Sequence, residues 1–146
     1  MPLPTAPPPA ATNVGVGVAA PGRLHLGFLD PSGSLGRRFG SLGLVVGGFQ
    51  TRLTLRRASA PRLSSATPEA QRELERAGEH LTVLQRHSGR TEPLQLHLAE
   101  TLPAHAGFGS GTQLALAIGR AFAALHGLPL TTAEIARLLG RGRRSG

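Results

Sequence analysis

A glycine-rich segment, residues 103–113, contains the residue types with the clearest chemical potential. Its small and hydroxyl-bearing residues are Gly107, Gly109, Ser110, Gly111 and Thr112. Glycines let the backbone approach a ligand closely, and hydroxyl groups add hydrogen-bond donors. The segment runs directly into a predicted helix, whose N-terminus presents unpaired N–H groups and the positive end of the helix dipole. This combination predicts an anion site, most often one for phosphate.

The pattern alone leaves one alternative open, which is an ordinary glycine-rich turn closed by a Ser or Thr cap. Two common nucleotide motifs are excluded. A Walker A loop requires a lysine, and the sequence contains none. The spacing of a dinucleotide-binding loop, Gly-x-Gly-x-x-Gly directly after a strand, is also absent.

Alternating apolar residues predict the strands that position this segment. We expect Pro21-Gly22 to break the first run and Asp30 to Gly40 to form a loop. In residues 51–57, Leu53 and Leu55 are expected to point inward. The predicted strands cover residues 14–18, 23–27, 41–49, 51–57 and 94–98.

Three helices are predicted from caps and periodic apolar residues. The first begins at Thr67-Pro68 and ends near Gly89, and the second carries its apolar face over residues 114–125. Thr131 and Glu134 form a capping box for a short third helix, which Gly140 ends. The mixed order of strands and helices predicts an α+β sandwich with helices on one face of a sheet.

Composition narrows the classes of function. The chain has 146 residues, no cysteine and a formal net charge of +8. The absence of cysteine excludes a disulfide scaffold and Cys-ligated metals, and it is compatible with the cytoplasmic location that we expect. We find no signal peptide and no apolar run that would span a membrane, and residues 1–13 are predicted to be a disordered Pro/Ala-rich leader.

Two segments resemble motifs of the GHMP kinase superfamily. Residues 103–111, PAHAGFGSG, resemble its second motif, and residues 20–27, APGRLHLG, resemble its first. The resemblance implies a GHMP-type N-terminal domain over residues 14–146, a two-layer β/α sandwich like that of a ribosomal-protein domain. The superfamily's C-terminal domain has no counterpart here. This interpretation therefore takes the chain as truncated at its C-terminus, and the chain alone as an inactive or at most partly active fragment.

Departures from the general motifs are similar to one subgroup, the β-ribofuranosylaminobenzene 5′-phosphate synthases. These departures are GFGSGTQ at residues 107–113 and HLGFLDPSGSLGRRFGSLGL at residues 25–44. The resemblance implies a phosphoribosyltransferase of methanopterin biosynthesis, which joins phosphoribosyl pyrophosphate to a 4-substituted benzoate with loss of carbon dioxide and pyrophosphate. It also implies a phosphorylated small-molecule substrate, a magnesium requirement, a role in one-carbon metabolism, and a homo-oligomer in the full-length form.

The same resemblance implies roles for individual residues. Residues that would hold a phosphate or pyrophosphate are Gly107, Phe108, Gly109, Ser110, Gly111, Thr112 and Gln113. Arg23 and His25 would face the same cleft, and His105 would donate to an anion. Asp30 would bind Mg²⁺ through its carboxylate, since that ion takes one or two carboxylates together with phosphate oxygens. No catalytic acid or base is identified.

Two other interpretations remain open at this point. The first is a true GHMP small-molecule kinase, in which the same loop would hold the phosphates of ATP. The second is an RNA-binding module, which the net charge of +8 suits. Two features argue against RNA binding. The arginines are scattered along the sequence, and five Phe are the only residues among Phe, Tyr and Trp.

Overall fold

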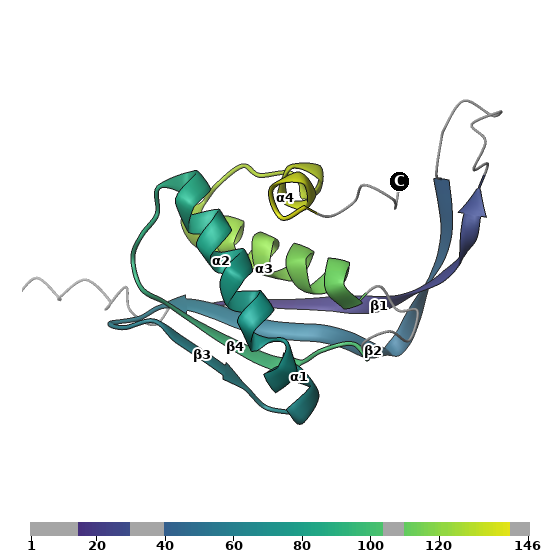
Figure 1. Cartoon of the computed structure of the whole chain (residues 1–146), viewed down its shortest axis with the longest axis horizontal. Helices are drawn as coiled ribbons and strands as arrows, with labels where there is room; N and C mark the ends of the chain where they lie inside the picture. Colours follow the sequence, from purple (N-terminus) through teal and green to yellow (C-terminus); the bar gives the residue numbers. More distant parts are fainter. Residues whose placement is uncertain (1–14, 30–39, 104–109, 141–146) are drawn as a thin grey trace, which may run out of the picture.

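The computed structural model describes residues 15–29, 40–103 and 110–140, with backbone alone for 23–29 and 40–47. The predicted leader, residues 1–13, lies outside the described residues. Two long antiparallel strands, β1 (Gly15–Leu29) and β2 (Gly40–Arg57), begin the sheet. Figure 1 shows them running together beyond the helices at one end of the molecule.

The predicted break at Pro21-Gly22 is wrong, because β1 continues through it. Pro21 pairs with Gln50 and Gly22 pairs with Val46, so the partner strand bulges at this point and Gly48 takes a left-handed φ of 85°. Strand β1 lies at the edge of the sheet, where one side of the strand has no partner and a proline is tolerated. The two predicted strands 41–49 and 51–57 are likewise one bulged strand. This strand begins at Gly40, which was predicted to end the preceding loop. The other residues of that predicted loop, 30–39, are not described.

Two further strands complete the sheet in the order β1-β2-β4-β3. Strand β4 (Leu94–Glu100) confirms the prediction, with Leu94, Leu96 and Leu98 buried on one face. Strand β3 (Arg62–Ser65) is parallel to β4 at the opposite edge and was not predicted from the sequence. Four residues, most of them polar, are too few to show a strand period.

The first predicted helix is divided into α1 (Pro68–Arg72) and α2 (Leu74–Ser88). The predicted start and end are confirmed: the Thr67 side chain caps the Ala70 N–H, and Gly89 ends α2 in a left-handed conformation with φ 70°. The division falls at Glu73, whose N–H bonds to the Ala70 carbonyl three residues back at 3.0 Å. This tighter turn closes α1 before α2 begins.

The two later helices follow the sequence prediction closely. Helix α3 (Ser110–His126) buries its apolar face, and α4 (Thr132–Leu138) begins with the capping box of Thr131 and Glu134. Gly140 follows with φ 69°. Gly119 lies against Ile135, and a Cβ at Gly119 would overlap the Ile135 side chain, so the glycine permits close packing of α3 on α4.

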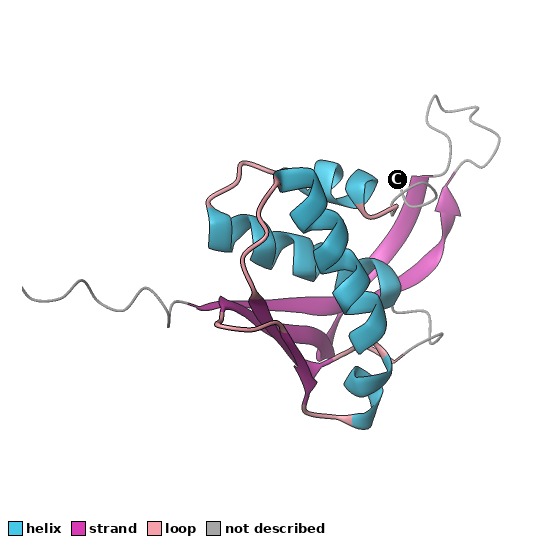
Figure 2. Cartoon of the chain, turned by 60° about the vertical axis from the view of Figure 1, so that its left-hand side comes forward, coloured by secondary structure: helices cyan, strands magenta, loops and turns pink. Residues whose placement is uncertain are grey.

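The helices form a layer on one face of the sheet (Figure 2), and the core lies between the two layers. The fold is thus the expected α+β sandwich with a mixed four-stranded sheet. The largest fully buried side chains come from β2, β4, α2, α3 and α4: Thr51, Leu53, Leu55, Leu84, Leu96, Leu98, Leu114, Ile118, Phe122 and Ile135.

Candidate functional site

The N-terminus of α3 lies within the glycine-rich segment singled out from the sequence. The helix begins at Ser110, so residues 110–113 form its first turn, and all four are half-buried. The first four N–H groups of a helix have no partner within the helix. Because this turn contains no acidic residue, nothing in it offsets the positive end of the dipole. The turn is therefore suited to an anion.

The rest of the glycine-rich segment falls outside the described residues. This applies to His105, Gly107, Phe108 and Gly109, and also to Asp30. The structure thus describes Ser110, Gly111, Thr112 and Gln113 from the predicted phosphate-binding set. Their proposed ligand stays a prediction.

The first motif lies at the bulge of the β1-β2 pair. Arg23 is paired with Val45 and His25 with Gly43, so the structure places both backbones on β1 directly after Gly22. The structure does not describe the side chains of these two residues. Their predicted substrate contacts are not tested.

The structure brings the first motif against the residue that precedes the second motif. A Cβ added to Gly22 would lie 3.0 Å from Leu102 Cδ2, and Leu102 immediately precedes the Pro103 that opens the second motif. Leu102 is buried, and α3 packs on both β1 and β2. Gly22 of the first motif therefore lies beside the residue from which the chain enters the second motif.

Two buried hydroxyl groups near this region were not identified as candidates from the sequence. Thr51 Oγ1 and Thr101 Oγ1 are buried and have no hydrogen-bond partner among the described residues. A buried hydroxyl normally has a partner, because leaving it unpaired costs free energy. A signal for Thr51 existed, since it shares the inward position of Leu53 and Leu55 in the same strand.

A charged cluster lies at the opposite, C-terminal end of α3. Glu92 Oε1 lies 3.1 Å from His126 Nδ1, and Arg57 donates to the Leu125 carbonyl at 3.1 Å. Burial lowers the pKa of His126, although Glu92 opposes this shift. A backbone hydrogen bond lowers the pKa of Glu92, and His126 and Arg57 add to that effect. The cluster stabilises the end of the helix and is separate from the phosphate-binding turn.

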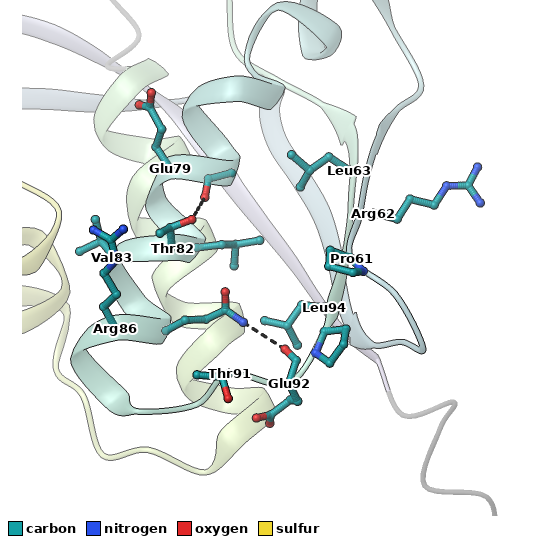
Figure 3. Close-up of a pocket in the computed structure, with 14 residues that line it drawn as sticks. Pro61, Arg62, Leu63, Glu79, Thr82, Val83, Arg86, Thr91, Glu92 and Leu94 are labelled. Atoms are coloured by element: carbon teal, nitrogen blue, oxygen red, sulfur yellow. Dashed lines mark hydrogen bonds between the residues drawn. The ribbon is translucent and has the colours of Figure 1, made fainter.

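A cavity of about 930 Å³ also lies away from the two motifs. It is a groove between α2 and strands β3 and β4, lined by Leu63, Val83 and Leu94 among others (Figure 3). Arg62 points away from α2 in this view. The groove contains none of the predicted site residues.

The described residues offer little for a metal ion. Among residues 15–29, 40–103 and 110–140, no group of three or more His, Asp or Glu side chains is arranged to hold one. The predicted Mg²⁺ ligand, Asp30, is not among them. Within the same ranges no helix has the length and apolar character needed to cross a membrane.

Comparison with known proteins identifies the family. The family model described as the GHMP kinases N terminal domain matches residues 75–146. A curated relative from Archaeoglobus fulgidus, named beta-ribofuranosylphenol 5'-phosphate synthase, is 35% identical over 86% of this chain and 38% of its own length. Residues 75–146 of the chain belong to the family of GHMP kinase N-terminal domains.

A second synthase of the same name, from Methanothermobacter thermautotrophicus, is 34% identical over 88% of this chain and 40% of its own length. The chain thus spans about two fifths of the curated relatives that it matches. Both relatives are enzymes by name.

Solved structures show the same GHMP fold. Streptococcus pneumoniae phosphomevalonate kinase aligns with a TM-score of 0.63 and 15% identity, over 86% of this chain and 39% of that one. Methanococcus jannaschii mevalonate kinase aligns with a TM-score of 0.64 and 12% identity, over 87% of this chain and 45% of that one. Identities this low establish the fold alone.

Proposed function

We propose that the chain is the phosphate-binding part of a phosphoribosyltransferase of the β-ribofuranosylphenol or β-ribofuranosylaminobenzene 5′-phosphate synthase type. The observation that carries this proposal is the pattern of identities. The relatives that are 29–35% identical all have the synthase name, whereas the structurally similar kinases cited above are 12% and 15% identical. The departures from the kinase motif at Gly111, Thr112 and Gln113 support the same choice.

The proposed reaction joins phosphoribosyl pyrophosphate to a 4-substituted benzoate. The ring carbon that carries the carboxylate attacks the anomeric carbon of the sugar, and the bond between the anomeric carbon and the pyrophosphate oxygen breaks. The carboxylate then leaves as carbon dioxide, and its bonding electron pair restores the aromatic ring. A phenol product, as in the name of the relatives, corresponds to an acceptor with a hydroxyl group at position 4.

In this proposal, the first turn of α3 binds the pyrophosphate of the donor. Negative charge builds on that group as its bond to the sugar breaks, so fixed N–H dipoles stabilise the transition state more than the ground state. Residues 110–113 provide these N–H groups, together with the hydroxyls of Ser110 and Thr112. Proton transfer to the leaving group is not required for this effect.

The remaining predicted residues complete the proposed site. Arg23, His25 and His105 would contact the substrate phosphates, because the first motif lies beside the start of the second. Asp30 would hold Mg²⁺, which supplies further charge neutralisation when it is bound.

The alternative is an ATP-dependent small-molecule kinase, in which the same turn would hold the phosphates of ATP. A thermal-shift titration with phosphoribosyl pyrophosphate and, separately, ATP distinguishes the two, each with magnesium. Stabilisation follows RT ln(1 + [L]/Kd), so the preferred ligand gives the larger shift at equal concentration. A shift with phosphoribosyl pyrophosphate alone supports the transferase. A shift with ATP alone overturns it in favour of the kinase.

A further inference from the structure

The face of the sheet that is turned away from α2, α3 and α4 has polar and cationic side chains. In β2, exposed Arg52, Thr54 and Arg56 alternate with the buried leucines. In β4, Gln95 and His97 alternate with the buried Leu94, Leu96 and Leu98 in the same way. This alternation places the polar residues of both strands on the open face.

The strand register arranges these residues in two rows across the sheet. In the first row, Arg56 and Arg62 both pair with Gln95, one from each side. In the second row, Thr54 and Ser64 both pair with His97. Neighbouring strands are about 4.8 Å apart, so the backbones of the two arginines of the first row lie about 10 Å apart.

A hollow of about 310 Å³ lies over these rows, lined by Thr54, Arg56, Ser64, Gln95 and His97. The adjoining strand β1 leaves it uncovered, because it contributes glycines there. A Cβ at Gly15 would lie 3.6 Å from Arg56 Cβ, and one at Gly17 would lie 3.9 Å from Thr54 Cγ2. Neither glycine carries a side chain that could fill the hollow.

Hydrogen bonds already orient part of this lining. Arg56 Nε donates to Gln95 Oε1 at 3.1 Å, which fixes the guanidinium beside the hollow and leaves its terminal nitrogens available. Ser64 Oγ lies 2.9 Å from His97 Nδ1. When Ser64 donates to Nδ1, the proton of a neutral His97 is on Nε2, which can then donate to a ligand.

The charge of the hollow favours an anion. None of its five lining residues is acidic, and Arg62, adjacent to Gln95, makes no ion pair within the described part of the chain. Arg52 on the same face is already paired with Glu100 at 3.0 Å. The arginine and the hydroxyl and imidazole donors match the oxygens of a phosphate group.

We propose that this hollow is a second phosphate-binding site, which holds the phosphate group of a small phosphate ester through Arg56, Thr54 and His97. It is separate from the first turn of α3 and does not depend on the proposed transferase activity. A small ester is favoured over a nucleic acid because no Phe, Tyr or Trp lines the hollow as a platform for base stacking.

The test titrates the isotopically labelled chain with inorganic phosphate and monitors the NMR signals of the His97 ring nitrogens. Chloride at matched ionic strength is the control anion. We expect saturable shifts with phosphate alone. Arg56→Gln should weaken binding about tenfold or more, and Thr54→Val, which keeps the charge, about threefold or more. Arg72→Gln, the same charge change at an exposed position of α1, should change binding less than twofold.

Two results would overturn the proposal. One is a His97 signal that does not saturate with phosphate or responds equally to chloride. The other is equal weakening by Arg72→Gln and Arg56→Gln, which would indicate general charge screening. Ser110→Asp separates this site from the one on α3. This variant should abolish the phosphate-dependent shifts at residues 110–113 and leave those of His97 unchanged. Loss of the phosphate-dependent shifts of His97 in that variant would also contradict the proposal.

Discussion

Gly22 of β1 packs directly against Leu102, the residue that precedes the second motif. A Cβ at Gly22 would lie 3.0 Å from Leu102 Cδ2 and 3.3 Å from the Phe49 carbonyl oxygen. This contact joins two segments that are far apart in the sequence and resemble two motifs of one family. The glycine is needed here for close approach between strands, and the backbone of Arg23 follows directly from it.

Gly22→Ala should therefore destabilise the chain by about 1–3 kcal/mol, since the added methyl group must displace Leu102 or the backbone of Phe49. Chemical denaturation measures this change. Gly17→Ala in the same strand is the matched control, because its nearest neighbour would be 3.9 Å away. Equal losses in the two variants would show that the contact with Leu102 is not the cause.

Gly119→Ala should also destabilise the fold by about 1–3 kcal/mol, because the new methyl group would overlap Ile135. This prediction opposes helix propensity, which favours Ala over Gly by about 1 kcal/mol. Ile135→Ala should reduce the penalty in the double variant, which a double-mutant cycle measures. Gly78→Ala in α2 is the control, since it meets only the flexible end of Leu63 and should be neutral or stabilising. A stabilising Gly119→Ala would contradict the packing of α3 on α4.

The stability of the chain should fall as the pH falls through the titration of His126. Burial lowers the pKa of this imidazole in the folded state below its ordinary value of 6.5, so the unfolded chain binds the proton first. The stabilisation is fully present above about pH 6.5 and is lost as the pH falls toward the folded-state pKa. Denaturation at several pH values measures this slope.

His126→Gln is the variant that isolates the effect, because it removes the titrating group at the end of α3. Its free energy of unfolding should depend less on pH between about 5 and 7 than that of the parent chain. His87→Gln on α2, at an exposed position, is the control and should leave the slope unchanged. An identical pH profile for the parent chain and His126→Gln would contradict the prediction. The lowered pKa of Glu92 contributes separately, with stability lost below about pH 4.5.

The sequence predicts best those elements whose signals are local. Helix α3 and strand β4 follow from apolar periodicity, and the Thr131 cap follows from its own side-chain chemistry. The continuity of β1 through Pro21 could not be read locally, because it depends on the strand's place at the sheet edge. Strand β3 exists through its pairing with β4, and its own residues contain no strand period.

The same distinction between local signals and contacts of distant segments applies to the candidate site. The glycine-rich segment was expected to run into a helix, and α3 begins within it, at Ser110. The contact between Gly22 and Leu102 was not predictable from spacing, since it depends on the bulge that Gly48 permits. The polar rows on the open face require the register of three strands, which no single segment reveals.

The central claim is that the first turn of α3 binds the phosphates of the donor. The most direct measurement is calorimetric titration of phosphoribosyl pyrophosphate into the parent chain, Ser110→Asp and Thr132→Asp. Both variants add one negative charge to the start of a helix, but Thr132 begins the exposed first turn of α4. We predict that Ser110→Asp weakens binding at least about tenfold, through charge repulsion and the lost anion site. Thr132→Asp should bind like the parent chain, and equal affinity in all three would contradict the claim.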